Sequence, residues 1–208
     1  MPPSQTDWDA KHSLAAREAA EAPAGILAEL CPLLPTGAAL DLACGRGRNA
    51  IFLAEHGRPV TAVDWSAAAL DLLEKRAQAL HLPVRRIQRI EKAKQARAGI
   101  DLVLADLESA QLEVNGYFLI LCVRYLQRSL FPQICRALRP GGMLLFETYT
   151  KAQLDFPGGP RNPAHLLDKG ELRKAFPELQ TVFYRELRAE QGIASLAARK
   201  PQGHSQGQ

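Results

Sequence analysis

A short glycine-rich turn between an apolar segment and a helical pattern most constrains the fold of this chain. Residues 39–44 are apolar except for one acid, Asp41, and Gly45 and Gly47 follow directly. Glycine tolerates positive φ and leaves no Cβ in the way of a ligand. A helix starting after Gly47 would present unpaired N–H groups above the turn. The sequence therefore predicts a strand, a tight turn and a helix, with a nucleotide-type site at the tip of the strand.

Two classes of cofactor fit this turn, and Asp41 distinguishes them. Gly45, Gly47 and Ala50 satisfy a dinucleotide fingerprint, and Asp64 stands at about the 20-residue offset of a ribose-binding acid. A dinucleotide would place its pyrophosphate beside the carboxylate of Asp41, which would repel it. S-adenosylmethionine carries an ammonium, a sulfonium and a ribose but no phosphate. The acid therefore favours S-adenosylmethionine, and an NAD-type oxidoreductase is the weaker alternative.

The rest of the chain alternates strand and helix signals, which predicts a parallel sheet with helices on both faces. Apolar runs typical of buried strands occupy residues 38–43, 59–63, 100–105, 117–123 and 143–150. Helical patterns occupy residues 47–55, 66–80, 128–138 and 169–176, and residues 179–186 and 193–199 indicate a hairpin. Prolines and glycines make residues 151–163 a long loop, of the kind that often carries function.

Residues 84–98 are the least conventional segment. Apolar residues recur there at helical spacing, and the other positions are mostly basic: Arg85, Arg86, Arg89, Lys92, Lys94 and Arg97. We expect a helix, and a strand over residues 84–90 is the alternative. Such a basic surface would suit RNA or an acidic partner, but a solvated helix face is the simpler interpretation.

Composition sets the remaining limits. The chain has 208 residues and a net charge of +4, which suits one domain and demands no anionic partner. Its four cysteines lack the spacing of metal ligands, so we expect buried free thiols and no metal site. No apolar run reaches the ~20 residues that cross a bilayer, and residues 1–8 do not resemble a secretory signal. We therefore expect a cytoplasmic monomer or homodimer without membrane contact.

These motifs resemble those of class I S-adenosylmethionine-dependent methyltransferases. The stretch from Asp41 to Asn49 is similar to the first motif of that family, and Val60 to Trp65 is similar to its second-strand acid. The order of motifs from residue 37 to about 199 resembles the tellurite-resistance, TehB-like branch. The turn at residues 187–192 departs from that branch, since Arg188 alone matches its His-Arg pair. Tellurite or selenium as substrate is therefore only an analogy.

The resemblance implies a Rossmann-like α/β three-layer sandwich with a seven-stranded, mostly parallel sheet and an antiparallel last strand. The methyltransferase domain would span residues 23–200. Residues 1–22 would form an arm or lid over the cofactor, and the polar residues 201–208 would be a disordered tail.

Three acids are expected to hold S-adenosylmethionine after successive strands. Asp41 would bind the ammonium, Asp64 the two ribose hydroxyls and Asp106 the adenine amine. Helix capping or plain exposure is the simpler interpretation of each. The full set of expected cofactor contacts is Asp41, Ala43, Gly45, Gly47, Arg48, Asn49, Asp64, Trp65, Asp106, Leu107 and Cys122.

The methyl acceptor is expected beyond residues 117–123. Arg124 would orient an anionic acceptor, and Tyr125 would form a pocket wall or take a proton, so these two are the candidate catalytic residues. An ordinary salt bridge and a core tyrosine are the alternatives. The chain lacks the Asn/Asp-Pro-Pro-Tyr motif that in this superfamily accompanies amide or nucleobase amine acceptors. A small molecule with a soft or acidic acceptor atom is therefore favoured. An RNA or protein methyltransferase using residues 84–98, or a non-catalytic cofactor-binding protein, remains the alternative.

Overall fold

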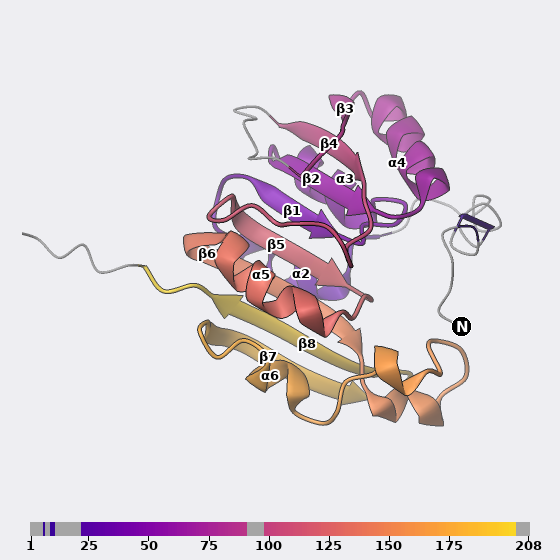
Figure 1. Ribbon diagram of the computed structural model, residues 1–208, viewed down its shortest axis with the longest axis vertical. Coiled ribbons are helices and arrows are strands. Elements are labelled where there is room, and N and C mark those ends of the chain that lie inside the picture. Colours follow the sequence, from indigo (N-terminus) through magenta and orange to yellow (C-terminus); the bar gives the residue numbers. More distant parts are fainter. Residues whose placement is uncertain (1–5, 7–8, 11–21, 91–97, 203–208) are drawn as a thin grey trace, which may run out of the picture.

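A single sheet organises the molecule. The computed structural model describes residues 6, 9–10, 22–90 and 98–202. Within these residues eight strands form one sheet in the order β3-β4-β2-β1-β5-β6-β8-β7 (Figure 1). The parallel part consists of β1 (Ala39–Leu42), β2 (Pro59–Asp64), β3 (Val84–Ile87), β4 (Gly99–Leu104), β5 (Tyr117–Val123) and β6 (Leu138–Tyr149). The expected Rossmann-like α/β architecture is confirmed.

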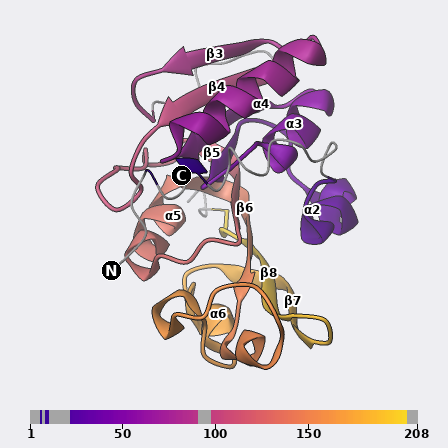
Figure 2. The same cartoon turned by 90° about the vertical axis from the view of Figure 1, so that its right-hand side faces the viewer.

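Helices cover both faces of this sheet (Figure 2). One face carries α2 (Gly25–Leu30), α3 (Arg48–Glu55) and α4 (Ala67–Ala79), and the other carries α5 (Phe131–Ala137) and α6 (Glu171–Lys174). Each face has its own apolar core, the first including Leu53 and Leu73 and the second Phe146 and Phe176. The alternation of strand and helix signals predicted this three-layer arrangement.

The C-terminal hairpin completes the sheet as expected. It consists of β7 (Gln180–Arg188) and β8 (Gly192–Arg199), and β8 pairs antiparallel with both β7 and β6. On its other side, β6 pairs with β5. Between two successive pairs of this ladder, β5 moves on by two residues, from Tyr117 to Leu119, whereas β6 moves from Leu138 to Met143. Residues 139–142, which lie between an expected helix and an expected strand, therefore form a bulge within a longer strand.

The start of α4 follows its sequence signals. Ser66 is the N-cap, and its Oγ accepts a hydrogen bond from the backbone N–H of Ala69 at 3.1 Å. Leu70, Leu73 and Ala77 are buried on the inner face of this helix. Leu80, the last residue of the expected helical range, is the C-cap residue and is 48% exposed.

The helix expected from residue 84 is wrong for the part that the structure describes. Residues 84–87 form β3, an edge strand that pairs in parallel with β4 and adds an eighth strand to the expected seven. Apolar residues three positions apart fit a helix, but they also place one side chain on each face of an edge strand. Val84 packs against one core and Ile87 against the other. Residues 91–97, the rest of the expected helix, lie outside the described residues.

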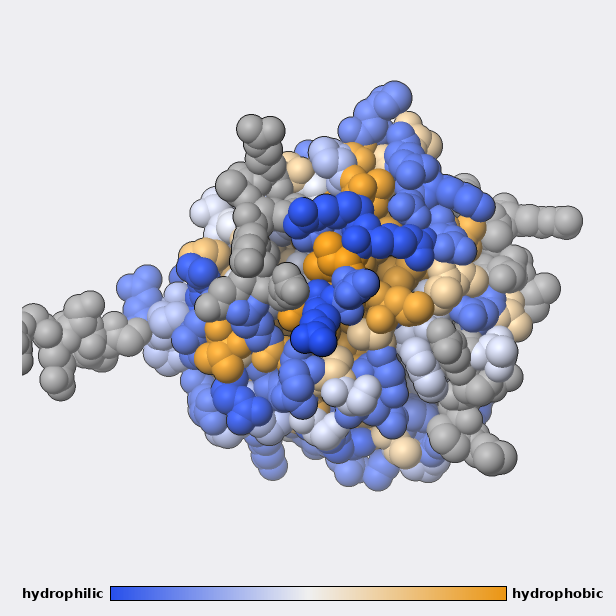
Figure 3. Space-filling view, turned by 45° about the horizontal axis from the view of Figure 1, so that its top comes forward, coloured by the Kyte–Doolittle hydropathy of each residue, from blue (hydrophilic) through white to orange (hydrophobic). Residues whose placement is uncertain are grey.

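The basic side chains of β3 are paired with acids of the same molecule. Nε of Arg85 lies 2.5 Å from Oδ1 of the buried Asp101. Arg86 contacts two acids of α4, Asp71 and Glu74. Figure 3 looks toward this side and shows hydrophilic residues around exposed hydrophobic ones. Two of the arginines that could have contacted RNA thus have internal partners, which weakens the nucleic-acid alternative.

The state of the cysteines agrees with a further expectation. All four cysteines are free thiols; Cys44, Cys122 and Cys135 are buried and Cys31 is half-buried. In the described part of the chain, no helix is long and apolar enough to cross a membrane.

Candidate cofactor and acceptor site

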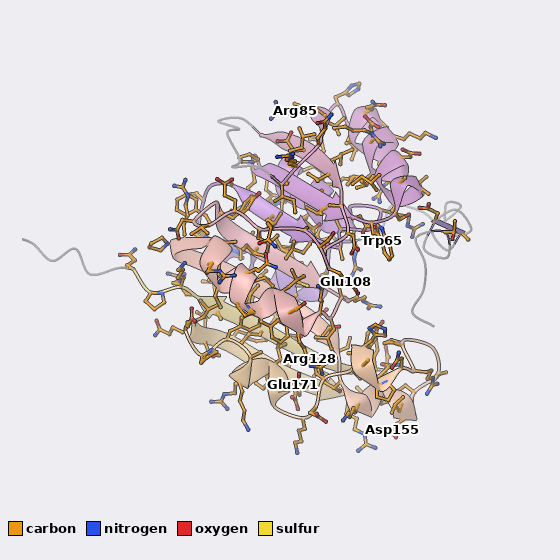
Figure 4. The ribbon with its side chains drawn as sticks, in the orientation of Figure 1. Trp65, Arg85, Glu108, Arg128, Asp155 and Glu171 are labelled. Atoms are coloured by element: carbon orange, nitrogen blue, oxygen red, sulfur yellow. The ribbon has the colours of Figure 1, made fainter. Side chains whose placement is uncertain are left out.

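The expected site residues gather at one edge of the sheet. β1 lies between β2 and β5, where the strand order changes direction, and ligands of open α/β sheets bind outside the carboxyl ends of the strands at such a point. Trp65 follows β2 and Glu108 lies in the segment after β4, and Figure 4 shows both on this side of the molecule. Arg85 lies away from them, at the outer edge of the sheet. The topology thus brings together the segments that follow β1, β2, β4 and β5.

The turn after β1 has the left-handed backbone that its glycines predict. Ala43, Gly45 and Gly47 have φ values of 53°, 55° and 77°. The sequence did not predict the packing role of Gly47. A Cβ built there would lie 2.1 Å from Cδ1 of Leu73 in α4, far inside van der Waals contact. Glycine at this position therefore allows both the turn and the close approach of two helices.

Asp41 carries the most informative charge of the site. It is 1% exposed, and its Oδ2 has no hydrogen-bond partner among the described residues. Burial raises its pKa from 3.8 to about 7, and the negative charge of Asp64 acts in the same direction. Arg48 and a hydrogen bond with the Ala50 backbone oppose this shift. Because a buried carboxylate oxygen without a donor costs free energy, the site fits a cationic ligand group.

Asp64 is already engaged by the protein. Its Oδ2 accepts the N–H of Gly45 at 2.7 Å, and its Oδ1 accepts the N–H of Ser66 at 2.8 Å. Ser66 and not Asp64 is the N-cap of α4, so the alternative interpretation of Asp64 as a helix cap is wrong, although its carboxylate binds the backbone of the cap residue. Each oxygen keeps a second lone pair, so ribose binding by the same carboxylate stays a prediction.

One residue of the N-terminal segment reaches this edge, and no sequence pattern signals it. Asp9 Oδ1 accepts hydrogen bonds from Ser66 Oγ at 2.5 Å and from the backbone N–H of Ala68 at 3.2 Å. This contact places Asp9 at the first turn of α4, next to Trp65, which is 38% exposed. The rest of the expected arm over residues 1–22, apart from Thr6, Ala10 and Ala22, lies outside the described residues, and a lid remains a prediction.

The loop after β4 is tied to the segment after β5. Asp106 Oδ1 accepts the N–H of Glu108 at 2.9 Å, which shapes a local turn. The carbonyl of the buried Leu107 accepts from Nε2 of Gln127 at 3.2 Å. Gln127, which sequence reasoning missed, also accepts a hydrogen bond from Oη of Tyr125 at 2.5 Å. Adenine binding by Asp106 and Leu107 stays a prediction.

Two expected cofactor residues direct their side chains to the protein. Asn49 is 4% exposed, and its Oδ1 accepts the N–H of Ala24 at 2.9 Å, just before α2. Cys122 is 1% exposed, its Sγ lies 3.6 Å from the carbonyl oxygen of Tyr125, and burial raises the pKa of its thiol. The side-chain oxygen of Asn49 and the thiol of Cys122 thus have internal partners, and contact of these residues with a cofactor stays a prediction.

Arg124 and Tyr125 follow β5 as expected. Arg124 has a φ of 59°, a left-handed conformation that costs a non-glycine residue about 1–3 kcal/mol. Its N–H donates to the carbonyl of Glu147 at 2.6 Å, and its Nη1 donates to Oη of Tyr149 at 2.7 Å. Burial is the main cause that raises the pKa of Tyr125, so its phenol stays protonated at neutral pH. Tyr125 therefore suits a pocket wall better than a general base.

A second arginine, Arg48, interacts electrostatically with both Asp41 and Arg124. Arg48 begins α3 and is half-buried. Burial lowers its pKa most, and the nearby positive charge of Arg124 lowers it further, whereas Glu147 and Asp41 act in the opposite direction. The site thus has a carboxylate and a guanidinium that interact electrostatically beside the glycine turn. A ligand with both an ammonium and a carboxylate is complementary to this pair.

Comparison with known proteins agrees with this geometry. Residues 39–142, half of the chain, match the methyltransferase domain family. The ubiquinone biosynthesis O-methyltransferase of Coxiella burnetii is 30% identical over 139 residues, which are 63% of this chain and 53% of that protein. The chain therefore spans about half the length of the curated relatives it matches.

Solved structures share the fold at low sequence identity. TehB from Haemophilus influenzae has a TM-score of 0.66 and 20% identity, over 85% of this chain and 62% of that one. The [4+2]-cyclase SpnF has a TM-score of 0.70 and 16% identity, over 97% of both chains. Geranyl diphosphate C-methyltransferase from Streptomyces coelicolor A3(2), solved with S-adenosyl-L-homocysteine, has a TM-score of 0.61 and 15% identity, over 84% of this chain and 75% of that one.

Proposed function

Because the chain belongs to the class I S-adenosylmethionine-dependent methyltransferases, we propose that it transfers a methyl group from S-adenosylmethionine to a small molecule. The cofactor would lie across the carboxyl ends of β1, β2 and β4, with the acceptor beyond the end of β5. The C. burnetii relative is named as an O-methyltransferase in the biosynthesis of a small molecule, which supports this class of acceptor.

The unpartnered oxygen of Asp41 is the observation that carries the proposal. Oδ2 of this buried carboxylate lacks a donor among the described residues, and an ammonium would supply one. Arg48 would hold the carboxylate of the same amino-acid group. A dinucleotide offers only a pyrophosphate to this turn, and the negative charge of Asp41 would repel it. This charge pattern therefore supports S-adenosylmethionine over NAD.

The chain would contribute alignment and exclusion of water more than proton transfer. When bound, S-adenosylmethionine supplies a methyl carbon activated by its sulfonium. Asp41 would hold the amino-acid end of that molecule and Asp64 its ribose, and Arg124 would border the acceptor. Since the phenol of Tyr125 stays protonated at neutral pH, it would not serve as a general base. A soft or already ionised acceptor atom needs none, which supports the expected acceptor chemistry.

Calorimetric titration with S-adenosylhomocysteine and with NADH tests the cofactor. We expect the homocysteine compound to bind and NADH not to bind. Asp41→Asn is expected to weaken binding by about tenfold or more, because a charge-assisted hydrogen bond is lost. Asp155→Asn, at an exposed ion pair with Arg188, is the matched control and is expected to bind like wild type. Binding of NADH alone, or unchanged affinity in Asp41→Asn, would contradict the proposal.

Methyl transfer needs its own test, because a [4+2]-cyclase shares this fold. The protein is incubated with radiolabelled S-adenosylmethionine and a cell extract, and small molecules are separated from macromolecules. We expect label in the small molecules. Label confined to RNA or protein would favour the macromolecular alternative. Cofactor binding without any labelled product would favour a non-catalytic role.

A further inference from the structure

We propose that the acceptor of this site is an organic anion and that Arg124 binds its charged group, a group distinct from the atom that receives the methyl. This inference rests on the proposed function, because it names the acceptor class of the same site. Tyr149 would act as a positioning residue by holding the guanidinium. Three observations on the described residues carry the inference.

The position of Arg124 is set by three adjacent strands. β5 pairs with β1 through Cys122 and Leu42, and with β6 through Val123 and Glu147. Arg124 is the next residue, so it leaves the sheet beside the end of the strand that carries Asp41. Its N–H donates to the carbonyl of Glu147, and it keeps a φ of 59°. A strained backbone of this kind persists where the surrounding structure holds it, commonly at ligand sites.

The guanidinium is held in place without being neutralised. Nη1 donates to Oη of Tyr149 at 2.7 Å, and Cζ lies 5.5 Å from the centre of that ring. Within the described part of the chain, no carboxylate lies within ion-pair distance of Arg124. The neighbouring carboxylate of Glu147 accepts a hydrogen bond from Ser195 Oγ at 2.7 Å. A guanidinium has five N–H donors, so most of those on Arg124 remain for a ligand.

Several other arginines of the chain are paired with acids. Arg85 pairs with Asp101, Arg128 with Glu171 and Arg188 with Asp155. Arg124 has instead a second cation near it, since its positive charge lowers the pKa of Arg48. Two neighbouring guanidiniums at the carboxyl edge of the sheet attract an anion and repel a cationic acceptor. Arg48 would serve the cofactor, which leaves Arg124 for the acceptor.

The charge of the methylated product tests this inference even when the acceptor is unidentified. Labelled small molecules from the cell-extract experiment are passed over an anion-exchange resin at neutral pH. We expect the label to be retained. Arg124→Gln is expected to reduce the retained label about tenfold or more, because a hydrogen-bonded charge partner is lost. Its affinity for S-adenosylhomocysteine is expected to stay within twofold of wild type. Arg188→Gln, whose arginine is paired with Asp155, is the control and is expected to match wild type.

Tyr149→Phe separates positioning from folding. It keeps the ring under the guanidinium but removes the hydroxyl that accepts its hydrogen bond. We expect the amount of label retained on the anion-exchange resin to fall severalfold relative to wild type, whereas the melting temperature and the affinity for S-adenosylhomocysteine stay unchanged. Label in unretained products, or wild-type transfer by Arg124→Gln, would overturn the inference while the proposed function stands. Failure of wild type to bind S-adenosylhomocysteine would instead remove the proposed function, and the inference with it.

Discussion

The backbone N–H of Gly45 donates to Oδ2 of Asp64 across 2.7 Å, so the acid that ends β2 holds the turn that follows β1. Oδ1 of the same carboxylate accepts the N–H of Ser66, the N-cap of α4. One side chain thus joins the glycine turn, a neighbouring strand and the next helix. A ribose bound by Asp64 would add to a structural role that the carboxylate already has.

Replacement of Asp64 is therefore expected to affect folding as well as binding. Asp64→Asn keeps one acceptor oxygen and turns an N–H group toward a backbone donor. We expect a loss of about 1–3 kcal/mol in the free energy of unfolding, measured by urea denaturation, and weaker binding of S-adenosylhomocysteine. Asp106→Asn is the control, because Oδ1 of Asp106 accepts only a local N–H from Glu108. Equal stability of the two variants would contradict the role assigned to Asp64.

Gly47 offers a test of helix packing against backbone strain. Gly47 and Gly57 share a φ of 77°, but a Cβ would collide with Leu73 only at Gly47, and at Gly57 it meets nothing within 4 Å. Gly57→Ala should lower the free energy of unfolding by about 1 kcal/mol through strain alone. Gly47→Ala should add the cost of an overpacked core, about 1–3 kcal/mol more.

Urea denaturation, which measures these free energies of unfolding, also allows a check with a double variant. Leu73→Ala combined with Gly47→Ala removes the collision but keeps the strain. The cost of Gly47→Ala is therefore expected to be smaller in the Leu73→Ala background than in wild type. Equal costs in both backgrounds would show that the contact with Leu73 does not explain this glycine.

Local signals predicted the centre of the fold, and contacts distant in sequence limited the rest. The order of strand, glycine turn and helix around Asp41 is encoded within about a dozen consecutive residues, so it could be predicted. The spacing of Val84 and Ile87 suited a helix and an edge strand equally, and only pairing with β4 decides between them. The sequence could not show that Ile87 would face a core on the opposite side of the sheet from Val84.

Within the site, too, some features could be predicted from the sequence and others could not. Parallel strands bring their carboxyl ends to one edge, so the positions of Asp41, Asp64 and Asp106 could be predicted. The partners of those side chains could not. Asn49 Oδ1 is used by Ala24, which lies 25 residues earlier, and the guanidinium of Arg124 meets Tyr149, which lies 25 residues later. No local pattern signals such contacts.

Arg128 is expected to hold the loop at the carboxyl edge. It forms a bidentate pair with Glu171 and donates to the carbonyls of Ala164 and Leu166, and Figure 4 shows the two charged residues together. Arg128→Gln should raise amide hydrogen exchange over residues 163–171 and cost about 1–2 kcal/mol in stability. Lys151→Gln removes only an exposed pair with Asp168 and should leave both exchange and stability close to wild type. Unchanged exchange in Arg128→Gln would contradict this role.

The raised pKa of Asp41 makes both stability and cofactor binding depend on pH. Burial, with the charge of Asp64, raises this pKa to about 7 in the folded protein from the 3.8 of an ordinary aspartate. The folded state therefore holds this proton more tightly than the unfolded chain does. The contribution of Asp41 to stability should decrease as the pH rises from about 4 to about 7 and stay constant above that range.

A bound ammonium would favour the ionised carboxylate, so cofactor binding should have the opposite trend. Affinity for S-adenosylhomocysteine is expected to be constant above about pH 7 and to fall by up to about tenfold per pH unit below it. Calorimetry between pH 5 and 8 measures this dependence, and proton release on binding should be visible below pH 7 as a dependence of the heat on the buffer. Asp41→Asn should bind more weakly and lose the dependence. If wild type binds equally well across this range, Asp41 does not hold the ammonium, because ionisation of its carboxylate is what an ammonium in contact with it requires.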